Sequence, residues 1–353
     1  MPVLSRECAS QVASSVGSIG VSLPVQEELS APQFIELARA AEDEGADTMF
    51  VGEIAGLECF AALGMMAGAT TSIRLASGVV SIYTRSPVLT AMGFATVASL
   101  APGRVAAGLG TGSHVVVRDW HGGELNRPRT RMREFIVAFR RALSGHRVNL
   151  AGETVTVSDF RLRIPREGDE IPVLMGSFNA PMLRLAGAIA DGVILSFCPM
   201  DELPGRIAEV HAGAIEAGRD PGQLEIALYM SAYAGNELDA ALERFRRLVL
   251  QYAVQPTHRA GFAESIPKLE RATELWHSGD RRRAVALIPD EAVLRLCPIG
   301  SGADVAARLD ATRAAGVTLP VLAPQSLAPG DVQTPLETIR AVAAAQRARG
   351  RTK

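Results

Sequence analysis

Eight short apolar runs, separated by longer segments with helical periodicity, constrain the fold of this 353-residue chain more than any other feature. The runs cover residues 19–23, 47–52, 73–83, 104–109, 171–175, 191–197, 224–231 and 317–323. Most are continuously apolar, as strands covered on both faces must be, and this indicates a parallel sheet. Eight parallel strands that alternate with helices predict a closed (β/α)8 barrel, an α/β fold. We therefore expect one barrel domain over residues 19–353.

Two segments interrupt this alternation. Residues 147–165 alternate polar and apolar side chains around Gly152, which predicts a β-hairpin between the fourth and fifth strands. Residues 251–295 contain helix-like pieces separated by prolines and predict a helical insertion between the seventh and eighth strands, where it could act as a lid or a dimer contact. Residues 1–18 have no long apolar core and are expected to form a flexible tail rather than a signal peptide.

The composition narrows the class of partner. A formal net charge of −2 gives no field that would attract nucleic acid or an anionic membrane, so we expect a small-molecule substrate, with neither nucleic acid nor membrane as partner. Four cysteines, Cys8, Cys59, Cys198 and Cys297, lie far apart without disulfide or metal spacing. They favour a reducing compartment, and thus the cytoplasm. No His and carboxylate cluster has the spacing of a metal site, so none is predicted.

Three glycines directly follow the fourth apolar run. In RVAAGLGTGS, Gly108, Gly110 and Gly112 are two residues apart, and backbone N–H groups in such a loop can bind a phosphate. The spacing differs from the G-x-G-x-x-G of dinucleotide-binding folds, and the next clear helix begins only near Pro128, so a Rossmann site is not expected. The alternative is that these glycines merely end a strand.

Glycines interrupt two neighbouring strands as well. Gly78 stands inside the third run, where glycine weakens a strand unless a ligand or another backbone approaches it. Gly176 and Ser177 follow the fifth run, just before a helix that begins near Pro181 and could offer N–H groups to an anion. Because the third, fourth and fifth strands are neighbours in a closed barrel, these glycines predict one ligand site at the carboxyl ends of the strands.

Three segments carry a resemblance to a known family. YTRSP, LAPGRVAAGLGTG and IPVLMGSFNAPMLRLAGAIADGVILS resemble the luciferase-like superfamily of flavin- and F420-dependent oxidoreductases, whose fold is a TIM barrel. They are most similar to the methylenetetrahydromethanopterin reductase branch. The resemblance implies coenzyme F420 as cofactor, with FMN as the alternative because other members bind FMN in the same place. It also favours a homodimer.

The resemblance further implies where the coenzyme binds. A non-prolyl cis peptide in the third strand falls at Gly78–Val79, beside Ser77, and would lie behind the deazaflavin ring. The remaining cofactor-binding residues implied are those of two turns that would hold the coenzyme phosphate: Gly110, Thr111, Gly112, Gly176 and Ser177.

Few residues are candidates for the chemistry. Glu53, at the end of the second strand, is the candidate proton donor and a coenzyme contact; the alternative is a buried acid paired with Arg85. His114, next to the glycine loop, is a second catalytic candidate that could contact ring or substrate. The residues expected to line the substrate side are Phe197, Cys198 and Tyr229.

Two departures from the related F420-dependent glucose-6-phosphate dehydrogenases limit the reaction. Those enzymes carry an Asp-His pair where this chain has Glu53 and Ile54, and a Glu where it has Ser113. We therefore expect an F420-dependent reductase that transfers hydride to an electrophilic C=N or C=C carbon of a small-molecule or natural-product substrate. The alternatives are an FMN-dependent monooxygenase supplied with reduced flavin by a partner reductase, and a catalytically silent coenzyme-binding barrel.

Overall fold

Eight parallel strands close into a barrel in this computed structural model, which describes residues 19–24, 28–164, 170–256 and 259–350. In order around the barrel they are β1 (Gly20–Ser22), β2 (Thr48–Val51), β3 (Arg74–Ser77), β5 (Val105–Gly110), β8 (Val173–Gly176), β9 (Gly192–Ser196), β10 (Glu225–Ala234) and β12 (Leu319–Pro324). β12 pairs with both β10 and β1, which closes the ring. The predicted barrel is confirmed, and each of its strands overlaps one of the eight apolar runs. Two short strands, β4 (Val80–Ser81) and β11 (Ile299–Gly300), pair with β5 and β10.

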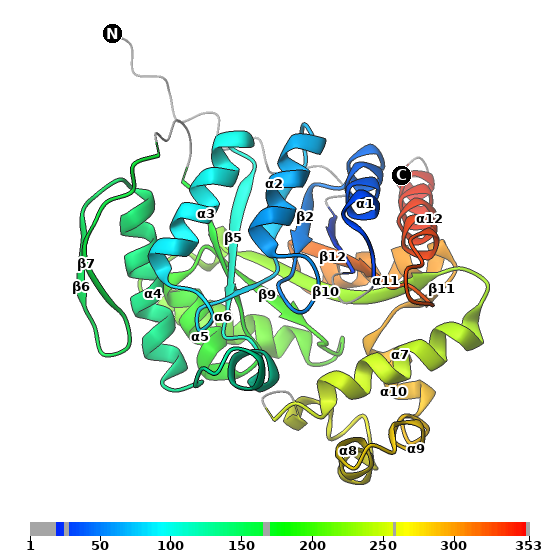
Figure 1. The fold of residues 1–353 in the computed structure, drawn as a ribbon. Coiled ribbons are helices and arrows are strands. Elements are labelled where there is room, and N and C mark those ends of the chain that lie inside the picture. The colour runs from blue at the N-terminus through cyan, green and yellow to red at the C-terminus, as the bar shows by residue number, and fades with distance from the viewer. Residues whose placement is uncertain (1–18, 25–27, 165–169, 257–258, 351–353) are drawn as a thin grey trace.

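Helices surround the barrel (Figure 1). They are α1 (Ala31–Asp43), α2 (Cys59–Ala69), α3 (Pro87–Leu100), α4 (Pro128–Leu143), α5 (Ala180–Ile189), α6 (Leu203–Glu216), α11 (Gly302–Ala314) and α12 (Gln333–Gly350). α1 illustrates why these segments are helical: Pro32 lies in the first turn, and the Ser30 backbone N–H donates to the Gln33 side chain over 2.8 Å. Gly45 and Gly316 have φ of 85° and 102°, the left-handed conformation expected just after a helix.

The barrel interior is filled by both small and large apolar side chains. Its buried members are Phe50, Ala76, Ala106, Leu174, Ile194, Ala227, Leu319 and Val321. Val79 and Tyr229 pack against this cluster but stay partly exposed. The interior is therefore a packed core, and a ligand can enter only above it, at the carboxyl ends of the strands.

The predicted hairpin is present as β6 (Val148–Ala151) and β7 (Thr156–Phe160), which pair antiparallel and lie along α4 (Figure 1). The Glu134 carboxylate of α4 accepts hydrogen bonds from the backbone N–H groups of Glu153, Thr154 and Val155 over 2.7 to 3.0 Å. This interaction fixes the hairpin turn on the outside of the barrel.

The predicted insertion between the seventh and eighth barrel strands is helical. It contains α8 (Leu269–His277), α9 (Arg281–Val285) and α10 (Asp290–Leu296), preceded by α7 (Leu238–Ala253), and Figure 1 shows these four helices as a group at one end of the barrel. They have a hydrophobic cluster of their own, which Phe197 and Tyr233 join from the barrel. The expected tail, residues 1–18, lies outside the described residues. Among those described, no helix is both long and apolar enough to cross a membrane.

Candidate active site

The chain bulges where β3 ends. The peptide bond between Gly78 and Val79 is cis, as the family resemblance implies, and the strand resumes as β4 against β5. The Ser77 hydroxyl is fully buried and donates to the Gly108 carbonyl oxygen over 2.6 Å. Ser77 therefore fixes the end of β3 to β5 and holds the bulge at the carboxyl end of the barrel.

Val79 is the centre of this bulge. A Cβ atom added to Gly110 of β5 would lie 2.4 Å from Val79 Cγ2, and one added to Gly176 of β8 would lie 3.1 Å from Val79 Cγ1. A Cβ on Gly108 would lie 1.8 Å from the Ser77 carbonyl oxygen. Glycine is needed at positions 108 and 110 because the bulge occupies the space of a side chain. The structure thus brings the glycines of three neighbouring strands together, although for a packing reason that the sequence did not reveal.

Two turns lie beside the bulge, at the ends of β5 and β8. Gly112 has φ of 72°, and the preceding Thr111 carbonyl oxygen accepts a hydrogen bond from the Ser81 hydroxyl over 3.1 Å. The Ser177 N–H donates to the Ile194 carbonyl oxygen over 3.2 Å, so this backbone group is already paired. α5 begins just after, with the Asn179 side chain accepting from its first turn. The coenzyme phosphate predicted between these two turns stays a prediction.

Glu53 forms an ion pair at the end of β2. Its carboxylate accepts hydrogen bonds from Arg85 Nε, at 2.9 Å to Oε2 and 3.2 Å to Oε1, and from Nη2, at 2.5 Å to Oε1. Arg85 also pairs with Glu58 and lies over the Phe60 ring, 4.8 Å from its centroid. The hydrogen bonding that Arg85 donates to the Glu53 carboxylate is the main cause that raises the pKa of Arg85. The pairing with Arg85 anticipated as the alternative for Glu53 is present, and it orients the carboxylate.

Two buried polar atoms near the barrel mouth have no partner. Among the described residues, His114 Nδ1 and the Tyr229 hydroxyl are the buried side-chain nitrogen and oxygen atoms that lack a hydrogen bond. His114 immediately precedes a π-helix, Val115–Trp120. This conformation is rare in proteins, and where it occurs it is often part of a functional site. Tyr229 lies on β10, with its ring centroid 5.2 Å from that of Phe50. Unpaired buried polar atoms mark places where a ligand can supply the missing partner.

The other residues expected on the substrate side differ in their surroundings. Phe197 has φ of 45°. Its ring centroid lies 4.2 Å from that of Tyr252, so the Phe197 side chain packs into the helical insertion. Cys198 is buried, and burial is the main cause that raises the pKa of its thiol to about 11. A thiol with such a pKa is neutral at pH 7, so Cys198 can line the site but does not act as a nucleophile.

Sequence reasoning missed two features of this site. The contacts of Arg85 with Glu58 and Phe60 were not predicted, although Arg85 is the only charged residue between Arg74 and Arg104 in the sequence. A lone charge in an apolar stretch is a signal that could have identified it. The π-helix after His114 has no such signal, because its sequence, VVVRDW, is typical of a strand.

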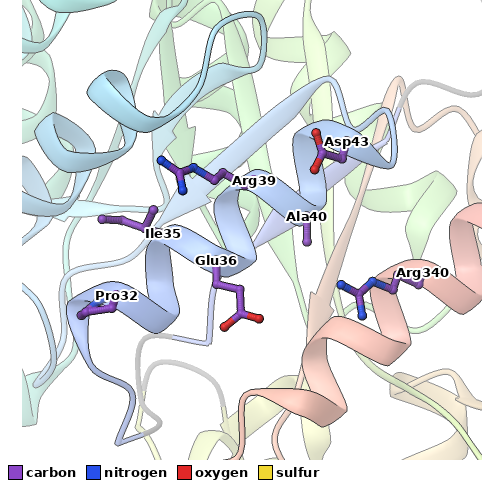
Figure 2. A pocket seen from close by; sticks show the side chains of 7 residues that line it. All are labelled: Pro32, Ile35, Glu36, Arg39, Ala40, Asp43 and Arg340. Carbon is purple, nitrogen blue, oxygen red and sulfur yellow. The ribbon is translucent and has the colours of Figure 1, made fainter.

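Two surface hollows lie elsewhere. One lies between the outer helices α1 and α12, and Figure 2 shows its lining of Pro32, Ile35, Glu36, Arg39, Ala40, Asp43 and Arg340. Another lies over α4, α5 and α6. Both are on the outer helical layer, whereas binding residues of such barrels come from the carboxyl ends of the strands. The candidate site is therefore the bulge and its surroundings.

Comparison with known proteins agrees with this geometry. The family model described as luciferase-like monooxygenase matches residues 15–319. The chain belongs to this family. The family resemblance inferred from the sequence is confirmed, and the cis bulge of this luciferase-like chain lies within the matched region.

Individual relatives are similar over different lengths. A 5,10-methylenetetrahydromethanopterin reductase of Methanolobus tindarius is 31% identical over 193 residues, which are 54% of this chain and 58% of the relative. An F420-dependent glucose-6-phosphate dehydrogenase of Nakamurella multipartita is 26% identical over 285 residues, 76% of this chain and 84% of the relative. The solved structure of the F420-dependent tetrahydromethanopterin reductase of Methanopyrus kandleri superposes with a TM-score of 0.80 at 24% identity, covering 91% of this chain and 96% of that one. This last similarity shows the fold.

Proposed function

We propose that this luciferase-like protein is a coenzyme F420-dependent reductase that transfers hydride to an electrophilic C=N or C=C carbon of a small-molecule or natural-product substrate. The observation that carries the proposal is the bulge at Gly78–Val79, seated against Gly110 and Gly176 at the carboxyl end of the barrel. The relatives described as F420-dependent enzymes support the choice of coenzyme.

The residues around the bulge fit a flat ring with a phosphate tail. Val79 and Tyr229 offer a partly exposed apolar floor above the packed barrel interior. His114 Nδ1 and the Tyr229 hydroxyl lack partners, so they can form hydrogen bonds to a ligand without giving up existing ones. The turns at Gly110–Gly112 and Gly176–Ser177 would hold the phosphate, with Ser77 and Val79 behind the ring.

The protein has a limited task in hydride transfer. Bound reduced F420 would supply a hydride to the electrophilic carbon of the substrate. The chain has to hold the two reacting carbons together and exclude water. A proton must also reach the substrate nitrogen or the second carbon of the double bond, and Glu53 is the group we assign to deliver it from solvent. Arg85 keeps the Glu53 carboxylate in one orientation through the hydrogen bonds described above.

Binding and turnover can be tested separately. The purified protein is titrated with oxidised F420 and with FMN, and quenching of coenzyme fluorescence gives both dissociation constants. Reduced F420 is then mixed anaerobically with imines, conjugated enones and ketones, and its oxidation is followed by absorbance. We expect F420 to bind at least tenfold more tightly than FMN, and an imine or enone to be reduced.

Matched variants define the role of Glu53. We expect Glu53→Gln to lower kcat by about 100-fold, within the range for removal of a general acid, while the F420 dissociation constant changes less than threefold. Glu58→Gln, which removes the more exposed carboxylate at Arg85, should lower kcat by less than fivefold. Tight FMN binding without a response to F420 would favour the monooxygenase, and F420 binding without reduction of any acceptor would favour a silent coenzyme-binding barrel.

We also propose a cytoplasmic homodimer with no nucleic-acid or membrane partner. The structure describes three of the four cysteines, Cys59, Cys198 and Cys297. All three are free and buried, which supports a reducing compartment. α3 has no charged residue, yet it exposes Leu89, Met92 and Leu100 by 43 to 56%, an apolar surface that a second subunit could cover. Light scattering coupled to size exclusion should give twice the chain mass of 37.3 kDa.

A further inference from the structure

Tyr229 reaches across the barrel interior. Its strand, β10, lies opposite β3, because four strand pairings separate the two in either direction around the ring. A Cβ atom added to Gly78, just after β3, would lie 1.8 Å from the Tyr229 hydroxyl oxygen. The hydroxyl therefore occupies the place of a side chain at position 78, directly beside the bulge.

The Tyr229 hydroxyl is buried without a hydrogen-bond partner. Burial is the main cause that raises its pKa well above the ordinary value for tyrosine, so the group is a neutral O–H donor. An interaction of hydrogen-bond type with the nearby Ser22 hydroxyl opposes this rise in the pKa, although the two groups do not meet the distance and angle of an ordinary hydrogen bond. Tyr229 as a whole stays partly exposed, so its side chain borders the site from inside the barrel.

An unsatisfied buried hydroxyl destabilises a folded protein. Phenylalanine would fill nearly the same volume and keep the edge-to-face contact with Phe50 without that cost. Packing accounts for the ring of Tyr229 but not for its oxygen. The oxygen has no hydrogen bond of ordinary geometry within the protein, and the adjacent site is where a better partner would bind.

We propose that Tyr229 is a coenzyme-binding residue whose hydroxyl donates a hydrogen bond to an acceptor on the ring of the bound coenzyme. This inference rests on the proposed function, since it requires a ring with polar acceptors to lie against the bulge at Gly78–Val79.

The substitution Tyr229→Phe tests this proposal with two measurements that need no turnover. In the ligand-free protein, we expect the melting temperature to stay the same or rise by about 1 to 3 °C, because an unpaired buried group is removed. In a fluorescence titration with oxidised F420, we expect the dissociation constant to rise about 5-fold, the effect of one lost neutral hydrogen bond. A purely structural tyrosine would show the opposite pattern, with a lower melting temperature and unchanged binding.

Tyr233→Phe on the same strand is the matched control. The Tyr233 hydroxyl accepts a hydrogen bond from the Glu237 N–H over 3.0 Å, so its removal should lower the melting temperature and leave F420 binding unchanged. Equal F420 affinities for the unmodified protein and Y229F would overturn the proposal for Tyr229, while the proposed function stands. A weaker affinity accompanied by a fall in melting temperature as large as that of Y233F would also overturn it. Failure of the unmodified protein to bind F420 would instead refute the proposed function.

Discussion

Glu42 of α1 is the residue that most clearly couples folding to pH. Its carboxylate accepts hydrogen bonds from the backbone N–H groups of Thr71, Ser72 and Ile73, in the loop that leads into β3. Burial acts to raise the pKa of Glu42, but these hydrogen bonds outweigh it and lower the pKa from 4.5 to about 2. Because the folded-state pKa lies below the unfolded one, the stabilisation is complete above about pH 5 and is lost as the pH falls toward 2.

The substitution Glu42→Gln should therefore have a pH-dependent effect. At pH 7 we expect the free energy of unfolding to fall by about 1 to 2 kcal/mol, an amount discounted for the partial exposure of the site. At pH 3 the difference from the unmodified protein should shrink by more than half. Urea unfolding at both pH values measures this, with Glu36→Gln on the exposed side of the same helix as the control. A difference that is equal at both pH values would contradict the assignment.

At the level of single residues, the sequence predicted positions better than interactions. Glu53 was recognised because it follows a strand, and its pairing with Arg85 was one of two alternatives. No local sequence pattern distinguished the two alternatives, because Glu53 and Arg85 are 32 positions apart and meet only when the barrel closes. The unpaired state of the Tyr229 hydroxyl is likewise a property of the assembled interior, to which several strands contribute.

At the level of elements, substitution of a glycine in β5 tests how the bulge is packed. Gly110→Ala would place a Cβ atom 2.4 Å from Val79 Cγ2, and we expect the free energy of unfolding to fall by about 1 to 3 kcal/mol. In a Val79→Ala background, which removes both Cγ atoms, the same change should cost at least about 1 kcal/mol less. Gly205→Ala in α6, with no atom within 4 Å of the added Cβ, is the control and should not destabilise. Equal costs in both backgrounds would show that Val79 does not impose the glycine.

The strands and both insertions could be predicted because each has a local pattern. Buried parallel strands are continuous apolar runs, and the hairpin has a period of two. The split of the third run into β3 and β4 was indicated only by Gly78 and by family resemblance. The glycines of β5 were interpreted as a phosphate-binding signal, whereas the space of a side chain at Gly108 and Gly110 is taken by Ser77 and Val79. A close approach between strands leaves the same sequence signal as a close approach to a ligand.

At the scale of the whole molecule, two hydrophobic clusters meet at the carboxyl end of the barrel. Phe197 belongs to the cluster of the insertion, whereas the next residue, Cys198, belongs to that of the barrel. Arg295 of α10 joins the same regions by polar contacts: its Nη2 lies 2.7 Å from Asp201 Oδ2, and its Nη1 donates to the Ser265 hydroxyl. The insertion is thus attached to the loop that follows β9.

Removal of this attachment should loosen the insertion without unfolding the barrel. For Arg295→Ala we expect amide hydrogen exchange in α8 and α10 to become about 3- to 10-fold faster, which corresponds to roughly 1 kcal/mol for a partly exposed ion pair. Exchange in the barrel strands should not change, because their hydrogen bonds and core side chains are independent of Arg295. Arg271→Ala, which breaks the exposed pair with Glu274 inside α8, is the matched control and should have little effect on α10. If both variants alter α10 equally, the clusters are held together by Phe197 and its apolar neighbours, and the arginine is dispensable.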